Sequence, residues 1–137
     1  EKGASTIEDF AKIIYEEASA EGVRPEVVFA QAMHETGWLQ FGGSVKVEQC
    51  NFAGLGAVDQ ATGGASFESV RIGIRAQIQH LKAYASKDSL VNACVDPRFN
   101  YVRRGSAPNL VDLNGKWAVP GTGYGEAIGK IVEAVCK

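Results

Sequence analysis

The sequence predicts a mostly helical α+β domain in which two long loops separate the helices. Four segments repeat apolar residues at intervals of three or four, which is the period of an amphipathic helix. The stretch 41–67 is too rich in glycine for a helix and carries short alternating patches around 44–48 and 65–67. It therefore predicts a small, irregular β-hairpin or lobe. No repeat or linker divides residues 1–137, so we expect one domain.

Composition and charge exclude several classes of protein. The chain is 45% apolar and 22% charged, which is ordinary for a folded domain. Its net charge of -2 gives no basic field for nucleic acid or an anionic membrane. No apolar run is long enough to span a bilayer. We expect a monomer that binds neither nucleic acid nor membrane.

Two helices are expected before the glycine-rich stretch, over residues 6–20 and 25–36. Gly22 and Gly37 each follow the last apolar residue of a helical pattern, where glycine commonly ends a helix in the left-handed conformation. Pro25 suits the first turn of the second helix, because a proline there removes no helical hydrogen bond.

Two further helices are expected after the glycine-rich stretch. Apolar residues recur in steps of three and four between 70 and 85, and again between 124 and 135. A short helical turn is also expected near 90–95, and Pro97 would stop it. The segment 96–125 is the second long connection, and loops of this length in a compact domain are usually functional.

Cysteine and histidine give little sign of a metal centre. Cys50, Cys94 and Cys136 contain no paired CxxC spacing. Two of them can form one disulfide and leave a free thiol, or all three can be small buried residues. His34 and His80 are far apart in the sequence and lack clustered ligands, so we expect no metal and no cofactor.

The carboxyl group of Glu35 stands out at the end of the second predicted helix. It shares a helix face with Val28, Gln31 and Ala32, which is largely an inward stripe. Partial burial and the negative end of the helix dipole both raise the pKa of a carboxyl group, and Trp38 could add an apolar wall. A raised pKa suits a general acid at neutral pH. The alternative is a surface glutamate that frays from the helix end or pairs with a basic residue.

Several motifs resemble one known family. "VVFAQAMHETGW" (27–38) followed by "CNFAGLGA" (50–57) is similar to the active-site helix and following loop of glycoside hydrolase family 73, the glucosaminidase type of bacterial peptidoglycan hydrolase. The resemblance continues in 69–86, 96–102 and 115–135, in the same order. The segments look most like the glucosaminidase modules of clostridial autolysins and phage lysins, that is, endolysins.

The resemblance implies a fold, a reaction and a location. It implies a lysozyme-like domain, with a helical lobe and a small glycine-rich β lobe flanking a glycan cleft. It implies hydrolysis of the β-1,4 bond between N-acetylglucosamine and N-acetylmuramic acid in peptidoglycan, without a cofactor. Such an enzyme is secreted and acts at the cell wall. We expect residues 1–137 to be one catalytic module of a larger protein.

The resemblance also implies which residues form the cleft. Sugar rings present apolar faces fringed with hydroxyl groups, so a glycan cleft combines aromatic platforms with hydrogen-bonding groups. Each aromatic residue could instead belong to the core, and this alternative is strongest for the tyrosine that begins the last apolar stripe. The family pattern places the acid at Glu35, the Asn-x-x-Gly loop at Asn51, Phe52 and Gly54, the cleft tyrosine at Tyr124, and further aromatic platforms at Trp117 and Tyr101.

A second catalytic carboxylate is harder to find. Glycoside hydrolysis usually needs two carboxyl groups. Glu68 is the first candidate to act with Glu35, although it can also serve as an N-terminal charge for the following helix. Glu48 and Asp59 are the next candidates. The acetamido group of the substrate, or a water held by Tyr124, could take this role instead.

Two rival functions fit parts of the sequence. A lytic transglycosylase or muramidase on the same scaffold would fit the missing second carboxylate, because a transglycosylase uses a single acid/base. A glycan-binding module without catalysis would share the aromatic cleft but has no use for an acid on an inward helix face.

Overall fold

The computed structural model describes residues 3–4, 6–41, 47–56, 64–118 and 121–136. Within these ranges the chain is helical, and its strand-like pairing is limited to an isolated bridge in the connection before the last helix. The α-helices are α1 (Ile7–Glu21), α2 (Pro25–Thr36), α3 (Val70–Ala85) and α4 (Tyr124–Val135), and the short 3-10 helices are η1 (Val47–Gln49), η2 (Phe99–Tyr101) and η3 (Leu110–Leu113).

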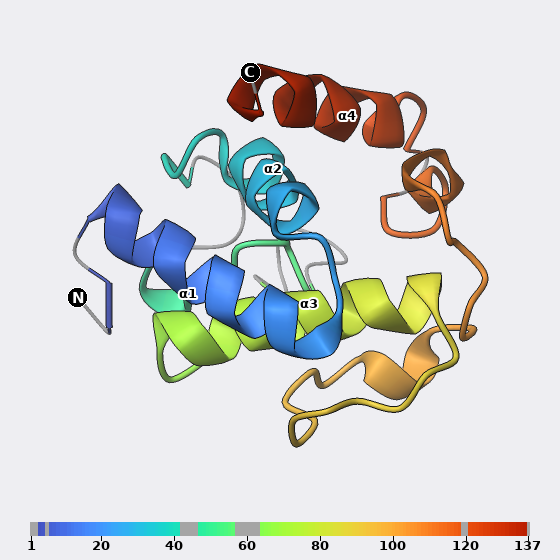
Figure 1. Cartoon of the computed structure of the whole chain (residues 1–137), viewed down its shortest axis with the longest axis horizontal. Helices are drawn as coiled ribbons and strands as arrows, with labels where there is room; N and C mark the ends of the chain where they lie inside the picture. Colours follow the sequence, from blue (N-terminus) through green and yellow to red (C-terminus); the bar gives the residue numbers. More distant parts are fainter. Residues whose placement is uncertain (1–2, 5, 42–46, 57–63, 119–120, 137) are drawn as a thin grey trace.

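Helix α2 occupies the middle of the molecule. It packs against α1 on one side and α4 on the other, and α1 also packs along α3 (Figure 1). The 3-10 helix η3 lies against α4 and holds the start of that helix in place. The core between these elements is built mainly from Phe10, Ile13, Ile14, Val28, Met33, Phe52, Ile74, Ile78, Leu81 and Ile128.

The ends of the first two helices follow from local chemistry. The Thr6 hydroxyl accepts the backbone N–H of Asp9 at 3.1 Å and so caps α1. Gly22 ends α1 at φ 74° and Gly37 ends α2 at φ 59°, both in the left-handed region that glycine adopts without strain. Pro25 is the first residue of α2. The four expected helices are thereby confirmed, the first of them shifted by one residue.

The expected β lobe is not shown. Residues 42–46 and 57–63, which carry part of that expectation, lie outside the described residues. In the described part of the glycine-rich stretch, η1 is followed by an irregular loop with left-handed residues at Cys50, Gly54 and Gly56. Left-handed residues interrupt the pleat of a strand, so this loop is held by separate hydrogen bonds rather than by a sheet ladder.

The helical turn expected near 90–95 is wrong, because buried side chains bind the backbone of this segment directly. The Glu21 carboxylate accepts the N–H of Val91 at 3.0 Å. Further along, the Gln79 side-chain oxygen accepts the N–H of Val95 at 2.8 Å. These bonds satisfy N–H groups that a helical turn would otherwise pair internally.

No disulfide joins Cys50, Cys94 and Cys136, all of which belong to the described residues, so the disulfide alternative is not realised in the structure. Cys50 is buried as a small core residue, whereas Cys94 and Cys136 are exposed. Among the described residues, no helix combines the length and apolar character that crossing a membrane requires.

The packing of α3 on the glycine-rich loop generates the first prediction. A methyl group at Gly73 would lie 1.7 Å from the Cys50 carbonyl oxygen, whereas one at Gly129 in α4 would meet nothing within 4 Å. Alanine favours a helix over glycine by about 1 kcal/mol. We expect Gly129→Ala to stabilise the domain by up to about 1 kcal/mol, and Gly73→Ala to destabilise it by about 1–3 kcal/mol through overpacking. Urea unfolding of both variants measures the two free energies, and equal effects would contradict this packing.

Candidate active site

Glu35 lies in the last turn of α2, partly buried. Burial raises the pKa of its carboxyl group from 4.5 to about 7, and a hydrogen bond from Tyr124 opposes this rise only in part. Trp38, expected to add an apolar wall beside this carboxyl group, is 55% exposed. The raised pKa expected for Glu35 therefore comes mainly from its loss of contact with water.

The chain just after Glu35 turns sharply in an unusual conformation. Trp38, Leu39 and Phe41 have φ values of 59°, 69° and 52°, in the left-handed region that side chains other than glycine rarely adopt. Thr36 holds this turn: its buried hydroxyl accepts the N–H of Leu39 at 2.8 Å and donates to a carbonyl of α2. The acid thus stands directly before a strained and well-anchored turn.

Tyr124, the first residue of α4, brings that helix to the acid. Its hydroxyl donates to Oε2 of Glu35 and accepts Nε2–H of Gln31 at 3.0 Å. The phenol is buried, and burial raises the pKa of Tyr124 above its ordinary value, with the Glu35 charge as a smaller cause in the same direction. Tyr124 is therefore a neutral hydrogen-bond donor. The ring of His34 meets the Tyr124 ring edge-on at 5.3 Å, beside the acid.

The loop that contains Gly54 covers the other oxygen of Glu35. A methyl group at Gly54 would lie 3.3 Å from Glu35 Oε1, and Gly54 has φ 67°. Asn51 shapes this loop from inside: it is 1% exposed, its Nδ2 donates to the Leu55 carbonyl at 2.9 Å and its Oδ1 accepts the Leu55 N–H at 3.0 Å. The amide of Asn51 is thus engaged within the protein, and Gly54 brings the backbone of this loop against Oε1 without a side chain of its own.

Trp117 is tied to the same loop. Its indole N–H donates to the Ala53 carbonyl at 3.1 Å. His80 meets the indole edge-on at 4.6 Å between ring centroids, and Tyr84 lies 5.9 Å away at a tilt. His80 is in turn paired with the buried carboxylate of Asp96, with 2.7 Å between Nδ1 and Oδ2. Trp117, half-buried, therefore forms a fixed aromatic wall beside the loop that faces the acid.

Tyr101 extends this wall outward. It belongs to η2, is 77% exposed, and has the Arg98 guanidinium 4.8 Å from its ring centroid. Tyr101 and Tyr84 both line a hollow of about 640 Å³, together with Lys116. Tyr84 also contacts Trp117, so this one side chain links the hollow to the indole.

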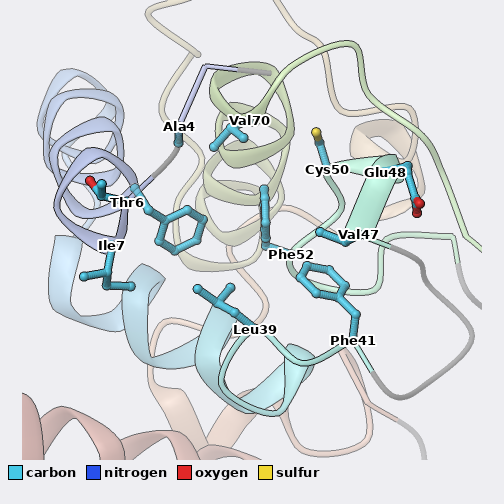
Figure 2. Close-up of a pocket in the computed structure, with 11 residues that line it drawn as sticks. Ala4, Thr6, Ile7, Leu39, Phe41, Val47, Glu48, Cys50, Phe52 and Val70 are labelled. Carbon is cyan, nitrogen blue, oxygen red and sulfur yellow. The ribbon is translucent and has the colours of Figure 1, made fainter. Parts of the chain in front are cut away.

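Phe52 is placed in the core rather than beside Glu35. Its ring packs edge-on against Phe10 at 4.9 Å and Phe41 at 5.9 Å. Figure 2 shows Phe52, Phe41 and Leu39 turned toward one another between the start of α1 and η1. They line a separate apolar pocket of about 390 Å³.

The candidates for a second carboxylate lie in different surroundings. Glu68 is exposed and stands one residue before Ser69, the N-cap of α3. Glu48 is exposed on η1 and lines the phenylalanine pocket. Asp59 lies outside the described residues.

Four residues that sequence reasoning did not assign to the site support it. Gln31 and Gln77 lead by hydrogen bonds to Tyr124, and His80 and Tyr84 pack on Trp117. Spacing offered a signal for two pairs: Gln31 stands four residues before the acid, and His80 stands four before Tyr84 on one face of α3. No local pattern indicates that Gln77 meets Gln31.

Comparison with known proteins identifies the family. The family model described as mannosyl-glycoprotein endo-beta-N-acetylglucosaminidase matches residues 11–135. An uncharacterized protein of Borreliella burgdorferi is 51% identical over 108 residues, which are 79% of this chain and 53% of that protein. The chain thus spans about half the length of this relative. No solved structure matches it. A match over nearly the whole chain shows that it belongs to the glucosaminidase family of glycoside hydrolases.

Proposed function

We propose that this domain hydrolyses the β-1,4 bond between N-acetylglucosamine and N-acetylmuramic acid in bacterial peptidoglycan, with Glu35 as the general acid. The observation that carries the proposal is the environment of Glu35, a carboxyl group whose burial raises its pKa to about 7 beside a loop that also binds the indole of Trp117. A general acid must hold its proton at working pH and still release it to the leaving oxygen, and a pKa near neutrality meets both needs.

The surroundings of Glu35 suit a sugar substrate. The indole of Trp117 offers an apolar face of the kind that packs on a pyranose ring, and Tyr84 and Tyr101 continue this surface outward. We assign Asn51 and Gly54 to shaping the loop over the acid, and Phe52 to the core beneath it. Hydrogen bonds to the substrate can then come from the backbone of this loop.

Glu68 remains our first proposal for the second carboxylate. It is exposed and follows the glycine-rich stretch. Its role would be to activate water or to stabilise the oxocarbenium-like transition state. The acetamido group of the substrate is the alternative. Tyr124, whose hydroxyl already binds Glu35 and Gln31, serves to orient the acid in our proposal.

The proposed substrate sets where the domain would work. Peptidoglycan lies outside the cytoplasm, so we propose an extracellular, wall-associated role, as an autolysin or an endolysin, for a monomeric module that uses no cofactor. Flanking parts of a longer protein would then determine where on the wall it acts.

Replacing the acid tests the catalytic proposal directly. Glu35→Gln keeps the shape and the hydrogen bond from Tyr124 but cannot donate an acidic proton. We expect the rate at which purified cell walls lose turbidity to fall by about 10²–10⁴-fold. Glu133→Gln, the same change at the exposed end of α4, is the control and should clear walls like the wild type. Equal clearing by both variants would contradict the role of Glu35.

The ends of the released glycans decide which bond breaks. Mass spectrometry of the digested walls should find N-acetylglucosamine at the new reducing ends. Reducing N-acetylmuramic acid would indicate a muramidase, and 1,6-anhydro ends a lytic transglycosylase. Binding to walls without any cleavage would indicate a glycan-binding module.

The raised pKa of Glu35 predicts that Glu35→Gln, which should lower activity, raises the stability of the domain at neutral pH. Between pH 4.5 and about 7 the folded protein holds a proton that the unfolded chain releases, so the free energy of unfolding falls as pH rises through this window. A rise from 4.5 to about 7 corresponds to about 3 kcal/mol. We expect Glu35→Gln to be as stable as the wild type near pH 4.5 and more stable by up to about 3 kcal/mol above pH 7. Urea unfolding at a series of pH values measures this difference, and a constant difference would show that Glu35 titrates normally.

Trp117 is predicted to act on substrate binding. Trp117→Ala should raise KM for soluble glycan fragments about tenfold, equivalent to about 1.4 kcal/mol of lost contact, with a smaller effect on kcat. Trp117→Phe keeps an aromatic face but loses the bond to Ala53, so it should fall between the wild type and Trp117→Ala. Tyr15→Ala removes an exposed aromatic residue of α1 and serves as the control. An unchanged KM in Trp117→Ala would assign the indole to structure alone.

A further inference from the structure

We propose that Gln31 and Gln77 are positioning residues that determine which oxygen of Glu35 carries the catalytic proton. Neither glutamine contacts the reacting bond; both act through Tyr124. Four buried or partly buried side chains form a hydrogen-bonded chain from Gln77 through Gln31 and Tyr124 to Glu35. The inference rests on the proposed role of Glu35 as the general acid. It adds the directions of the hydrogen bonds from Gln77 to Gln31, on to Tyr124 and then to Glu35.

The backbone carbonyl of Val28 sets the direction at the far end of the chain. A carbonyl oxygen can only accept a hydrogen bond, so the side-chain atom of Gln77 that lies 3.1 Å from it must be the nitrogen. The same nitrogen lies 3.0 Å from the side chain of Gln31. Reversing the Gln77 amide would bring two oxygens together, so the direction does not depend on telling oxygen from nitrogen in the side chain.

The donor and acceptor in each of the next two hydrogen bonds follow from this first one. Because Gln77 donates to Gln31, the Gln31 atom that it meets must be the oxygen, and the nitrogen of Gln31 faces Tyr124 at 3.0 Å. The Tyr124 oxygen therefore accepts from Gln31. A phenol makes its strongest hydrogen bonds in the ring plane, one donated and one accepted, so the remaining proton of Tyr124 points to Oε2 of Glu35.

This arrangement leaves one place for the proton of Glu35. Oε2 already accepts from Tyr124, whose accepting position is occupied by Gln31, so a proton on Oε2 would have no partner there. The proton is therefore held on Oε1. That oxygen faces Gly54, where a methyl group would lie 3.3 Å from it. The chain of glutamines thus points the acidic proton toward the loop at Gly54, and in our proposal the glycosidic oxygen approaches from this side.

Three titratable or polar groups of the described residues lie along this chain. Tyr124 from α4 lowers the pKa of Glu35 through its hydrogen bond. His34 from α2 contacts the edge of the Tyr124 ring. The side chain that α3 contributes to the chain, Gln77, is uncharged. A change at either glutamine should thus reach Glu35 through hydrogen bonding alone.

Methionine substitutions test the inference, because methionine has nearly the shape of glutamine but cannot donate an N–H. In Gln31→Met the accepting position of Tyr124 becomes free, and a protonated Glu35 can donate from Oε2 to Tyr124. In Gln77→Met the Gln31 amide is free to reverse and accept the Tyr124 proton, with the same result. Both variants should lower kcat about tenfold and leave KM unchanged. Both should also move the basic limb of the pH profile upward by about one unit, because the Tyr124 hydrogen bond that favours the ionised acid can then reverse and favour the protonated acid.

Gln79→Met is the matched control. Gln79 is also a fully buried glutamine of α3, but its side chain binds the backbone near Val95 rather than Tyr124. We expect this variant to lower Tm and leave the basic limb where it is in the wild type. If Gln31→Met and Gln77→Met also lower Tm without moving the limb, the glutamines are purely structural and the inference is wrong.

A direct titration separates this inference from the proposed function. Protein labelled with 13C at the glutamate side-chain carboxyl group reports the pKa of Glu35 by NMR, with the signal assigned by its loss in Glu35→Gln. A rise of about one unit in both methionine variants supports the hydrogen-bonded chain, even if the domain clears no walls. An unchanged pKa overturns it, even if the wild type clears walls efficiently.

Discussion

The hydrogen bond between Tyr124 and Glu35 joins the two parts of the domain that form the site. Glu35 ends α2 and Tyr124 begins α4, so the bond exists only when these helices pack together. Burial of this pair excludes water from the carboxyl group of Glu35 and raises its pKa. A raised pKa suits a proton donor, but the ionised form of Glu35 then makes the folded state less stable. The position of α4, which η3 also contacts, thus determines the environment of Glu35 as well as the packing of the core.

The aromatic wall and the acid are coupled through one short loop. Trp117 binds the carbonyl of Ala53, and the next residue, Gly54, lies against Glu35. Asn51 holds the loop from within, and His80 supports the indole from behind. The indole therefore binds the residue next to the one that lies against Glu35. The site is built by contacts between segments that lie far apart in the sequence.

The helices could be predicted from the sequence because their signals are local. Apolar spacing, Pro25, Gly22 and Gly37 all act within a few residues, and the structure has the helices there. The irregular loop after η1 could not be predicted, because left-handed turns and side-chain bonds replace the regular ladder that an alternating pattern indicates. The burial of Glu35 followed from its helix face, whereas the bond from Gln77 to Gln31 depends on packing between α3 and α2.

The turn after α2 also shows where this sequence departs from the most stable one for its fold. Trp38 and Leu39 adopt left-handed backbone angles, which cost roughly 1–2 kcal/mol each in residues other than glycine or asparagine. Natural proteins retain such strain near working sites when the surrounding structure enforces it. A more heat-resistant version of this domain could therefore be engineered by placing glycine or asparagine at these two positions, if their side chains are not needed to bind the glycan.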